Sequence, residues 1–144
     1  MTRIDFYILA SSEAQERVQF ACRLIEKAYK LGRQLYVHTD DEQTTASIDD
    51  ALWQYRADSF IPHQRIDQQP ATPAPIEIGH QHDPKQHQDI LINLAHETPA
   101  FFSRFERVAE LVLQQPESLA ASRKSYAFYR DRGYPMKTHD MRKK

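Results

Sequence analysis

Glycine and cysteine are scarce in this chain. Its 144 residues include three glycines, Gly32, Gly79 and Gly133, which lie far apart. A dinucleotide-binding loop needs three clustered glycines, and a phosphate-binding loop ends in Gly-Lys followed by Ser or Thr. Neither motif occurs, which argues against a nucleotide-dependent enzyme. The one cysteine, Cys22, lies within an apolar helical pattern, so we expect a buried thiol and no disulfide within the chain.

Long hydrophobic runs are also missing. The apolar run at residues 4–10 is too short for a signal peptide or a membrane span. We therefore expect a cytoplasmic protein without membrane contact. With 40% hydrophobic and 27% charged residues, the composition is typical of a globular protein, and the length suits one domain with a hydrophobic core.

The hydrophobic pattern predicts alternating strands and helices. Strands are expected at residues 4–10, 34–38, 75–79, 90–94 and 108–113, although a continued helix is possible in the last range. Helices are expected from a Ser12–Gln15 capping box to Gly32, at 42–55 after an Asp40 cap, from Thr98 and Pro99, and from Pro116 to Gly133. This order predicts the α/β class: a single three-layer α/β/α domain at 1–136 with a mostly parallel sheet of about five strands, followed by a basic tail at 137–144.

Charge is distributed unevenly along the chain. The formal net charge is -1, yet residues 123–144 carry eight basic and two acidic side chains. The remaining residues therefore hold 11 basic and 18 acidic side chains. An acidic body with a basic end favours an acidic partner at that end, whereas the alternative is a solubilising tail.

The last predicted helix carries an aromatic side chain between two basic ones. Arg123, Tyr126 and Arg130 share one helix face, and Leu119 extends that face by one turn. Val112, just before the helix, is a candidate for an apolar floor. Two guanidinium groups beside an aromatic ring can bind a carboxylate next to an apolar side chain. Alternatively, Tyr126 belongs to the core and the arginines are solvated; the spacing does not decide between the two.

A second cluster combines the only tryptophan, Trp53, with Phe60, Ile61 and Pro62. Core packing is the default interpretation of such residues. However, Trp53 follows Asp49 and Asp50 on a helix, and Phe60 lies in an irregular segment bounded by Asp58 and His63. If the aromatic rings are exposed there, they indicate a protein interface.

Two polar groups are candidates for chemistry. His80, His82 and His87, with Asp83, are possible zinc ligands, but a solvated loop is the preferred interpretation. His38 ends a predicted strand and is followed by Asp40, Asp41 and Glu42, where an acid–base pair is conceivable. Since no nucleophile is singled out, we predict no catalytic residue, no metal and no cofactor.

Several motifs occur in the order and spacing of a known family. They are Phe6-Tyr-Ile-Leu9, Asp50-Ala-Leu-Trp53, Asp58-Ser-Phe-Ile-Pro-His63, Pro75-Ile-Glu-Ile78, Asp89-Ile-Leu-Ile-Asn-Leu94 and Arg123-x-x-Tyr126-x-x-Tyr129-Arg130-x-x-Gly133-Tyr134. Together they resemble the chi subunit of bacterial DNA polymerase III holoenzyme over nearly the whole chain. The block from Ala51 to His63 is the most specific part.

The resemblance implies a non-catalytic adaptor of DNA replication. Proteins of this family bind the psi subunit of the clamp loader on one side. On the other they hold the acidic C-terminal tail of single-stranded DNA-binding protein, which ends in a hydrophobic residue with a free carboxylate. The resemblance implies that the tail meets Arg123, Arg130, Tyr126, Val112 and Leu119. It likewise implies that psi meets Trp53, Phe60, Ile61 and Pro62, and that contact with DNA is indirect.

One departure from the family concerns the helix before Arg123. The family tends to carry another basic residue about one turn earlier, where this chain has Leu119-Ala-Ala-Ser122. We therefore expect the affinity for the tail, or the salt dependence of that affinity, to differ from that of family members with the basic residue. Two alternatives to the adaptor remain: a small nucleic-acid-binding protein that uses the basic end, and a small hydrolase that uses residues 38–42.

Overall fold

The computed structural model describes residues 1–55, 60–84 and 86–142. Asp58, Ser59, Lys143 and Lys144, which belong to the sequence patterns above, lie outside the described residues. The described helices and strands are β1 (Arg3–Ile8), α1 (Ala14–Lys30), β2 (Leu35–Thr39), α2 (Glu42–Gln54), β3 (His63–Arg65), β4 (Ile76–His80), β5 (Ile90–Asn93), β6 (Arg107–Val112), α3 (Pro116–Asp131) and β7 (Met136–Asp140), with short 3-10 turns at Ile66–Gln68 and Phe102–Arg104.

Within the described residues, seven strands form one sheet in the order β3-β4-β2-β5-β6-β1-β7, and every neighbouring pair is parallel. The predicted α/β class is confirmed, but the strand count exceeds the expected five or so. The strands missed from the sequence, β3 and β7, lie at the two edges. Their sequences, His-Gln-Arg and Met-Lys-Thr-His-Asp, lack an apolar pattern because edge strands tolerate polar and charged side chains.

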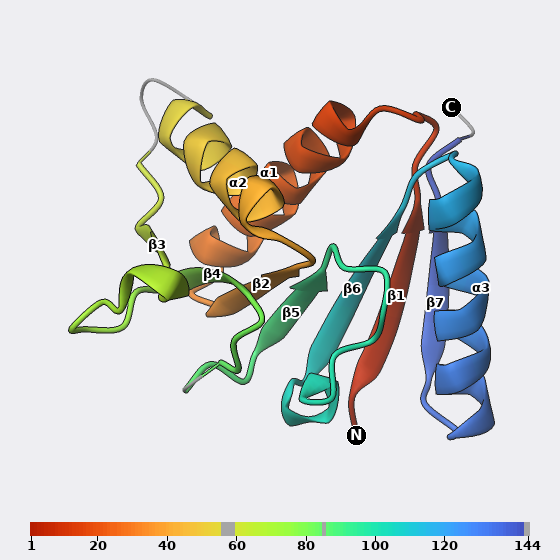
Figure 1. Cartoon of the computed structure of the whole chain (residues 1–144). Helices are drawn as coiled ribbons and strands as arrows, with labels where there is room; N and C mark the ends of the chain where they lie inside the picture. Colours follow the sequence, from red (N-terminus) through yellow and green to blue (C-terminus); the bar gives the residue numbers. More distant parts are fainter. Residues whose placement is uncertain (56–59, 85, 143–144) are drawn as a thin grey trace.

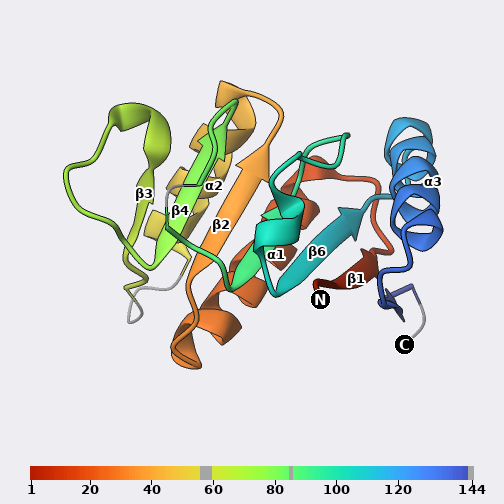
Figure 2. The same cartoon turned by 90° about the horizontal axis from the view of Figure 1, so that it is seen from below.

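Helices cover both faces of the sheet (Figures 1 and 2). α1 and α2 pack on one face, while α3 and the 3-10 turn at Phe102–Arg104 pack on the other. Successive side chains of β1 therefore point to different layers. Ile4 and Phe6 are buried beneath α3, whereas Asp5 and Tyr7 face the layer of α1. This alternation places one strand between two separate surfaces of the protein.

The N-terminal end of α1 differs from the prediction. The helix begins at Ala14 with Glu13 as N-cap and no side-chain cap, so the Ser12–Gln15 capping box is wrong. The Ser11 hydroxyl instead accepts a hydrogen bond from the Glu13 N–H at 2.9 Å. The C-terminal end agrees with the prediction, since Gly32 has a φ of +76° and donates to the Tyr29 carbonyl. Cys22 is buried, as expected.

Two other helix starts need correction. Asp41, and not Asp40, caps α2, because its carboxylate accepts a hydrogen bond from the Thr44 N–H at 2.8 Å. No α-helix begins at Thr98 within the described residues; the segment forms turns and the 3-10 turn at Phe102–Arg104. By contrast, Pro116 does occupy the first turn of α3, where its missing N–H costs no hydrogen bond.

The C-terminal segment joins the sheet. β7 pairs in parallel with β1, from Ile4 opposite Met136 to Ile8 opposite Asp140. The boundary expected after residue 136 thus falls at the start of β7, and residues 137–140 are part of the domain. The segment was predicted to be a tail because it is charged and has no apolar pattern. An exposed edge strand, however, also needs few apolar residues, so the two cannot be told apart from the sequence.

In the part of the chain that the structure describes, no helix is both long enough and apolar enough to cross a membrane.

Candidate protein-binding surfaces

The C-terminal helix, α3, is held in place by one buried side chain above all. Tyr129 is fully buried, and its hydroxyl donates a hydrogen bond to the Glu110 carboxylate of β6 at 2.7 Å. Its ring also packs edge-on against Phe6 and Phe102. Since Tyr129 faces the sheet, Arg123, Tyr126 and Arg130 are turned toward the outer edge of the helix.

A groove runs between α3 and the sheet edge formed by β1 and β7. It has a volume of about 350 Å³. Its lining residues are Phe6, Ile8, Ser122, Arg123, Tyr126, Ala127, Arg130 and Thr138. We call it the α3 groove. The Tyr126 ring, 42% exposed, lies 5.6 Å from the Phe6 ring between their centroids.

The α3 groove combines an apolar floor with two cations. Phe6, Ile8 and Tyr126 supply apolar surface. Arg123 is exposed, and Arg130 makes an exposed contact of 3.3 Å with Asp131. An exposed pair of this kind is weak, so Arg130 can exchange Asp131 for another carboxylate at little cost. The arrangement suits a ligand with an apolar side chain next to a carboxylate.

The structure brings three of the five predicted tail-binding residues together in this groove, namely Arg123, Tyr126 and Arg130. Val112 does not line it, because its side chain is buried in the core beneath α3. Leu119 is half-buried and packs against the same core. Both are apolar residues close together in sequence, but Val112 belongs to β6 beneath the helix, and Leu119 lies on the side of α3 that packs against the core.

Phe6, Ile8 and Thr138 line the groove and were not predicted from the sequence. The alternation of side chains along β1 already places Phe6 and Ile8 on one face. However, nothing in the sequence placed β1 beside α3. Thr138 carried no signal, because the polar strand β7 was not recognised.

A second exposed apolar cluster lies at the other end of the sheet. Trp53 at the end of α2 is 59% exposed and Phe60 is 64% exposed, with ring centroids 5.5 Å apart. The Trp53 ring also packs edge-on against His63, at 4.8 Å. We call this the Trp53–Phe60 patch. A hydrogen bond of 2.6 Å between His63 Nδ1 and the Ile61 carbonyl holds the ring behind the patch, and His63 Nε2 lies 3.4 Å from the Asp49 carboxylate.

The other two residues predicted for this surface are less exposed. Pro62 is half-buried at the border of the patch. Ile61 is 1% exposed and belongs to the core of the α1 and α2 layer. Its side chain therefore anchors the segment and is not on the surface. Extended backbone alternates direction, which explains why Phe60 and Ile61 point opposite ways.

Residues 38–42, the candidate acid–base region, make structural contacts. The Asp40 carboxylate accepts a hydrogen bond from the His96 N–H and contacts the His96 ring at 3.0 Å. Asp41 caps α2, and Glu42 pairs with Arg65 at 2.8 Å. The His38 ring packs edge-on against Phe101, and burial lowers its pKa.

The candidate zinc ligands are dispersed. His87 is buried, with its ring against the Ala74 carbonyl and the Glu77 carboxylate, so it is not in the solvated loop that we expected. His80 binds the Thr45 hydroxyl of α2 at 3.0 Å. Over the described residues, no group of three or more His, Cys, Asp or Glu side chains is placed to hold a metal ion.

The α3 groove and the Trp53–Phe60 patch both combine exposed aromatic rings with charged neighbours, as surfaces of protein-binding modules do. A family model for "DNA polymerase III chi subunit, HolC" matches residues 1–137. The chain is 43% identical over 139 residues to the DNA polymerase III subunit chi of Pseudomonas aeruginosa, covering 96% of each chain. It is 27% identical over 143 residues to the protein of the same name from Escherichia coli, covering 96% of this chain and 97% of that one.

A relative in Haemophilus influenzae with the same name is 28% identical over 138 residues. The chain therefore belongs to the chi subunit family of DNA polymerase III. It is a non-catalytic accessory subunit of the replicative holoenzyme.

Proposed function

We propose that this chi subunit bridges two partners. The α3 groove binds the acidic C-terminal tail of single-stranded DNA-binding protein. The Trp53–Phe60 patch binds the psi subunit of the clamp loader. Contact with DNA is then indirect, and the subunit works in the cytoplasm with the rest of the replication machinery. The observation that carries the proposal is the α3 groove, which combines an apolar floor with two arginines.

The chemistry of the tail suits the α3 groove. The resemblance described above gives the tail a terminal hydrophobic residue, a free carboxylate and further acidic residues. A volume of about 350 Å³ accommodates one large side chain and part of its neighbour. In such a complex Phe6, Ile8 and Tyr126 contact the apolar side chain. Arg123 and Arg130 meet the carboxylates, and charge-assisted hydrogen bonds of this type are stronger than neutral ones.

The chain has no basic residue about one turn before Arg123, where it reads Leu119-Ala-Ala-Ser122, so the positive charge near the groove is lower than in relatives that carry one. Lys124 does not line the groove, so it does not replace that charge. We therefore expect tail binding in this protein to depend more on apolar contact and less on salt than in relatives with the extra basic residue.

The two proposed surfaces are separated by the width of the sheet. The α3 groove lies at the β1–β7 edge, and the Trp53–Phe60 patch lies on α2 beside β3 at the opposite edge (Figure 1). An apolar patch with two exposed aromatic rings is typical of a protein interface. This separation supports simultaneous binding of both partners.

Titration calorimetry with the C-terminal peptide of single-stranded DNA-binding protein tests the groove. Arg123→Ala should weaken binding by about tenfold or more, because a charge-assisted hydrogen bond is lost. Lys124→Ala is the matched control, since it removes the same charge from the next position of α3 outside the groove.

Equal affinity for the peptide with and without its terminal residue would refute terminal-carboxylate capture. A thymidine oligonucleotide that binds as well as the peptide would favour direct DNA binding instead.

The psi surface is tested separately. Trp53→Ala or Phe60→Ala should abolish co-purification with psi and leave tail-peptide affinity unchanged. Leu31→Ala is the control, because Leu31 is an apolar side chain that is 71% exposed and lies outside both proposed surfaces. It should affect neither partner. If each aromatic substitution weakened both partners, the two-surface proposal would be rejected.

A further inference from the structure

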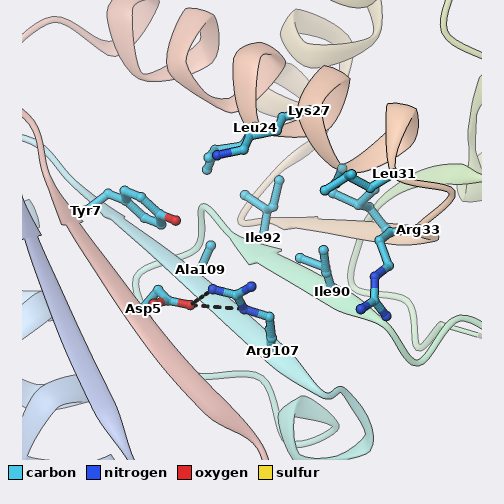
Figure 3. Close-up of a pocket in the computed structure, with 12 residues that line it drawn as sticks. Asp5, Tyr7, Leu24, Lys27, Leu31, Arg33, Ile90, Ile92, Arg107 and Ala109 are labelled. Atoms are coloured by element: carbon cyan, nitrogen blue, oxygen red, sulfur yellow. Dashed lines mark hydrogen bonds and ion pairs between the residues drawn. The ribbon is translucent and has the colours of Figure 1, made fainter.

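A second hollow lies on the opposite side of β1 from the α3 groove. It has a volume of about 200 Å³ and opens between α1 and the sheet (Figure 3). We call it the Lys27 pocket. Its floor is formed by Ile90, Ile92 and Ala109, and Leu24 and Leu31 of the α1 layer border it. Leu31 is among the most exposed large apolar side chains of the described chain.

Cations flank this apolar floor on both sides. Lys27 comes from α1 and Arg33 from the turn after it, while Arg107 comes from β6 on the far side (Figure 3). Lys27 has no hydrogen-bond or ion-pair partner among the described residues. Arg33 is held by an exposed contact of 3.6 Å with Glu106, which is weak and can be exchanged.

The one carboxylate in the pocket is already neutralised. Asp5 is buried and accepts hydrogen bonds from Arg107 at 3.0 Å and from His139 at 3.0 Å. Burial alone raises the pKa of Asp5, but these hydrogen bonds outweigh burial and hold the pKa below its ordinary value. Arg107 uses its Nε and Nη2 atoms for Asp5, which leaves Nη1 for a ligand. The pocket therefore presents net positive charge around an apolar floor.

From this geometry we infer that the Lys27 pocket is a second docking site, for an internal acidic peptide segment that carries one large apolar side chain. The volume accommodates about one such side chain. Cations on both sides of the floor fit carboxylates that precede and follow the apolar residue. Charge complementarity supports this occupant, because the lining holds Lys27, Arg33 and Arg107 against one carboxylate, Asp5, that is already paired within the protein.

Nucleic acid fits the pocket less well than a peptide. The floor is aliphatic, and the one aromatic side chain, Tyr7, is already stacked on His139 with centroids 4.4 Å apart. Stacking on free aromatic rings is what holds single-stranded bases on a protein surface. The proposal is independent of the function assigned to the α3 groove, because the two hollows lie on opposite faces of β1.

A blocked pentapeptide, acetyl-Asp-Asp-Phe-Asp-Asp-amide, is a direct probe. It has no free terminal carboxylate and so lacks the group proposed for the α3 groove. In a titration followed by amide NMR of the full chain, we expect shifts at Leu31, Ile90 and Arg107. Peptides with Ala in place of Phe, or Lys in place of Asp, should shift these signals much less. Shifts confined to the α3 groove, or equal shifts with the Ala peptide, would overturn the proposal.

Variants give an independent measurement. Lys27→Ala should weaken the blocked peptide by about threefold to fivefold, as expected for one exposed charge contact. Lys30→Ala is the matched control, because Lys30 is exposed on the same helix outside the pocket and pairs with Glu26 at 3.7 Å. Leu31→Asp should abolish binding while the protein remains folded. The proposal is contradicted if Lys30→Ala has the same effect as Lys27→Ala, or if a thymidine oligonucleotide of about ten nucleotides gives the same shifts as the peptide.

Discussion

Glu110 is a carboxyl group buried at the centre of the protein. It lies on β6, accepts hydrogen bonds from Tyr129 at 2.7 Å and from Asn93 at 3.1 Å, and so connects α3 to β5 and β6. Burial raises the pKa of Glu110 to about 7, although the two hydrogen bonds act in the opposite direction. This side chain therefore retains its proton in the folded state at pH values where the unfolded chain has lost it.

The raised pKa of Glu110 has a defined effect on stability. Well below pH 4.5 the group is protonated in both states, and its full contribution to folding is present. As the pH rises toward 7, the unfolded state releases the proton first, so the free energy of unfolding falls by up to about 3 kcal/mol. Urea unfolding at several pH values measures this decrease.

Glu110→Gln is the control for this prediction, because it removes the titration and keeps a similar shape. The difference in unfolding free energy between the two proteins should vary with pH between about 4.5 and 7 and level off above that range. A constant difference would show that Glu110 is ionised in the folded protein.

Gly79 is required by a close approach between neighbouring strands. A Cβ atom there would overlap the hydroxyl of Tyr36, a fully buried side chain that donates to the His82 carbonyl at 3.0 Å. Gly79→Ala should therefore lower the free energy of unfolding by about 1–3 kcal/mol. Tyr36→Phe removes the clashing oxygen, so the same substitution should cost less in that background. Equal costs in both backgrounds would contradict the proposed clash.

At the scale of the elements, β7 forms one wall of the α3 groove. Thr138 faces the groove, and the neighbouring Lys137 points to the other face of the sheet. Thr138→Phe should fill the groove and abolish tail-peptide binding, with little change in melting temperature because the site is exposed. Lys137→Phe adds the same ring on the opposite face. It should cost far less affinity, even though it also removes a positive charge.

This pair of variants also tests the register of β7. A shift of one residue along β1 would exchange the two faces. Lys137→Phe would then be the blocking substitution, and the groove described here would be wrong. Calorimetry with the tail peptide, together with thermal unfolding of both variants, distinguishes the two registers.

The elements differ in how well the sequence predicted them. β1, α1, β2 and β5 have apolar patterns because each packs on a buried layer, and their predicted ranges agree closely with the structure. The edge strands β3 and β7 carry no such pattern, since an edge needs only backbone hydrogen bonds on one side. The helix expected at Thr98 failed for another reason: a cap and a proline allow a helix to start, but the segment packs on the core through Phe101 and Phe102 as a single 3-10 turn.

At the scale of the whole molecule, the two proposed surfaces lie at opposite edges of one rigid sheet. Effects of substitutions at distant sites usually add. We therefore expect the tail peptide to bind the chi–psi complex and chi alone with affinities that differ by no more than about 0.5 kcal/mol. Arg123→Ala should cost the same in both. A larger difference measured by calorimetry would show coupling between the surfaces.

The sequence by itself determined the α/β class, the parallel core and the family. Apolar periodicity and motif order are properties of the sequence, and they can be recognised without knowing which elements pack together. It also placed Arg123, Tyr126 and Arg130 on one helix face, since that follows from helical geometry alone. Only the tertiary structure decided what lies opposite that face. The packing of α3 across β1 buried Val112, turned Leu119 inward and supplied Phe6, Ile8 and Thr138 as the floor and wall. On the other face of the sheet, the packing of α1 and α2 buried Ile61 while Phe60 stayed exposed, and it left the Lys27 pocket open beside α1. Burial depends on which elements meet.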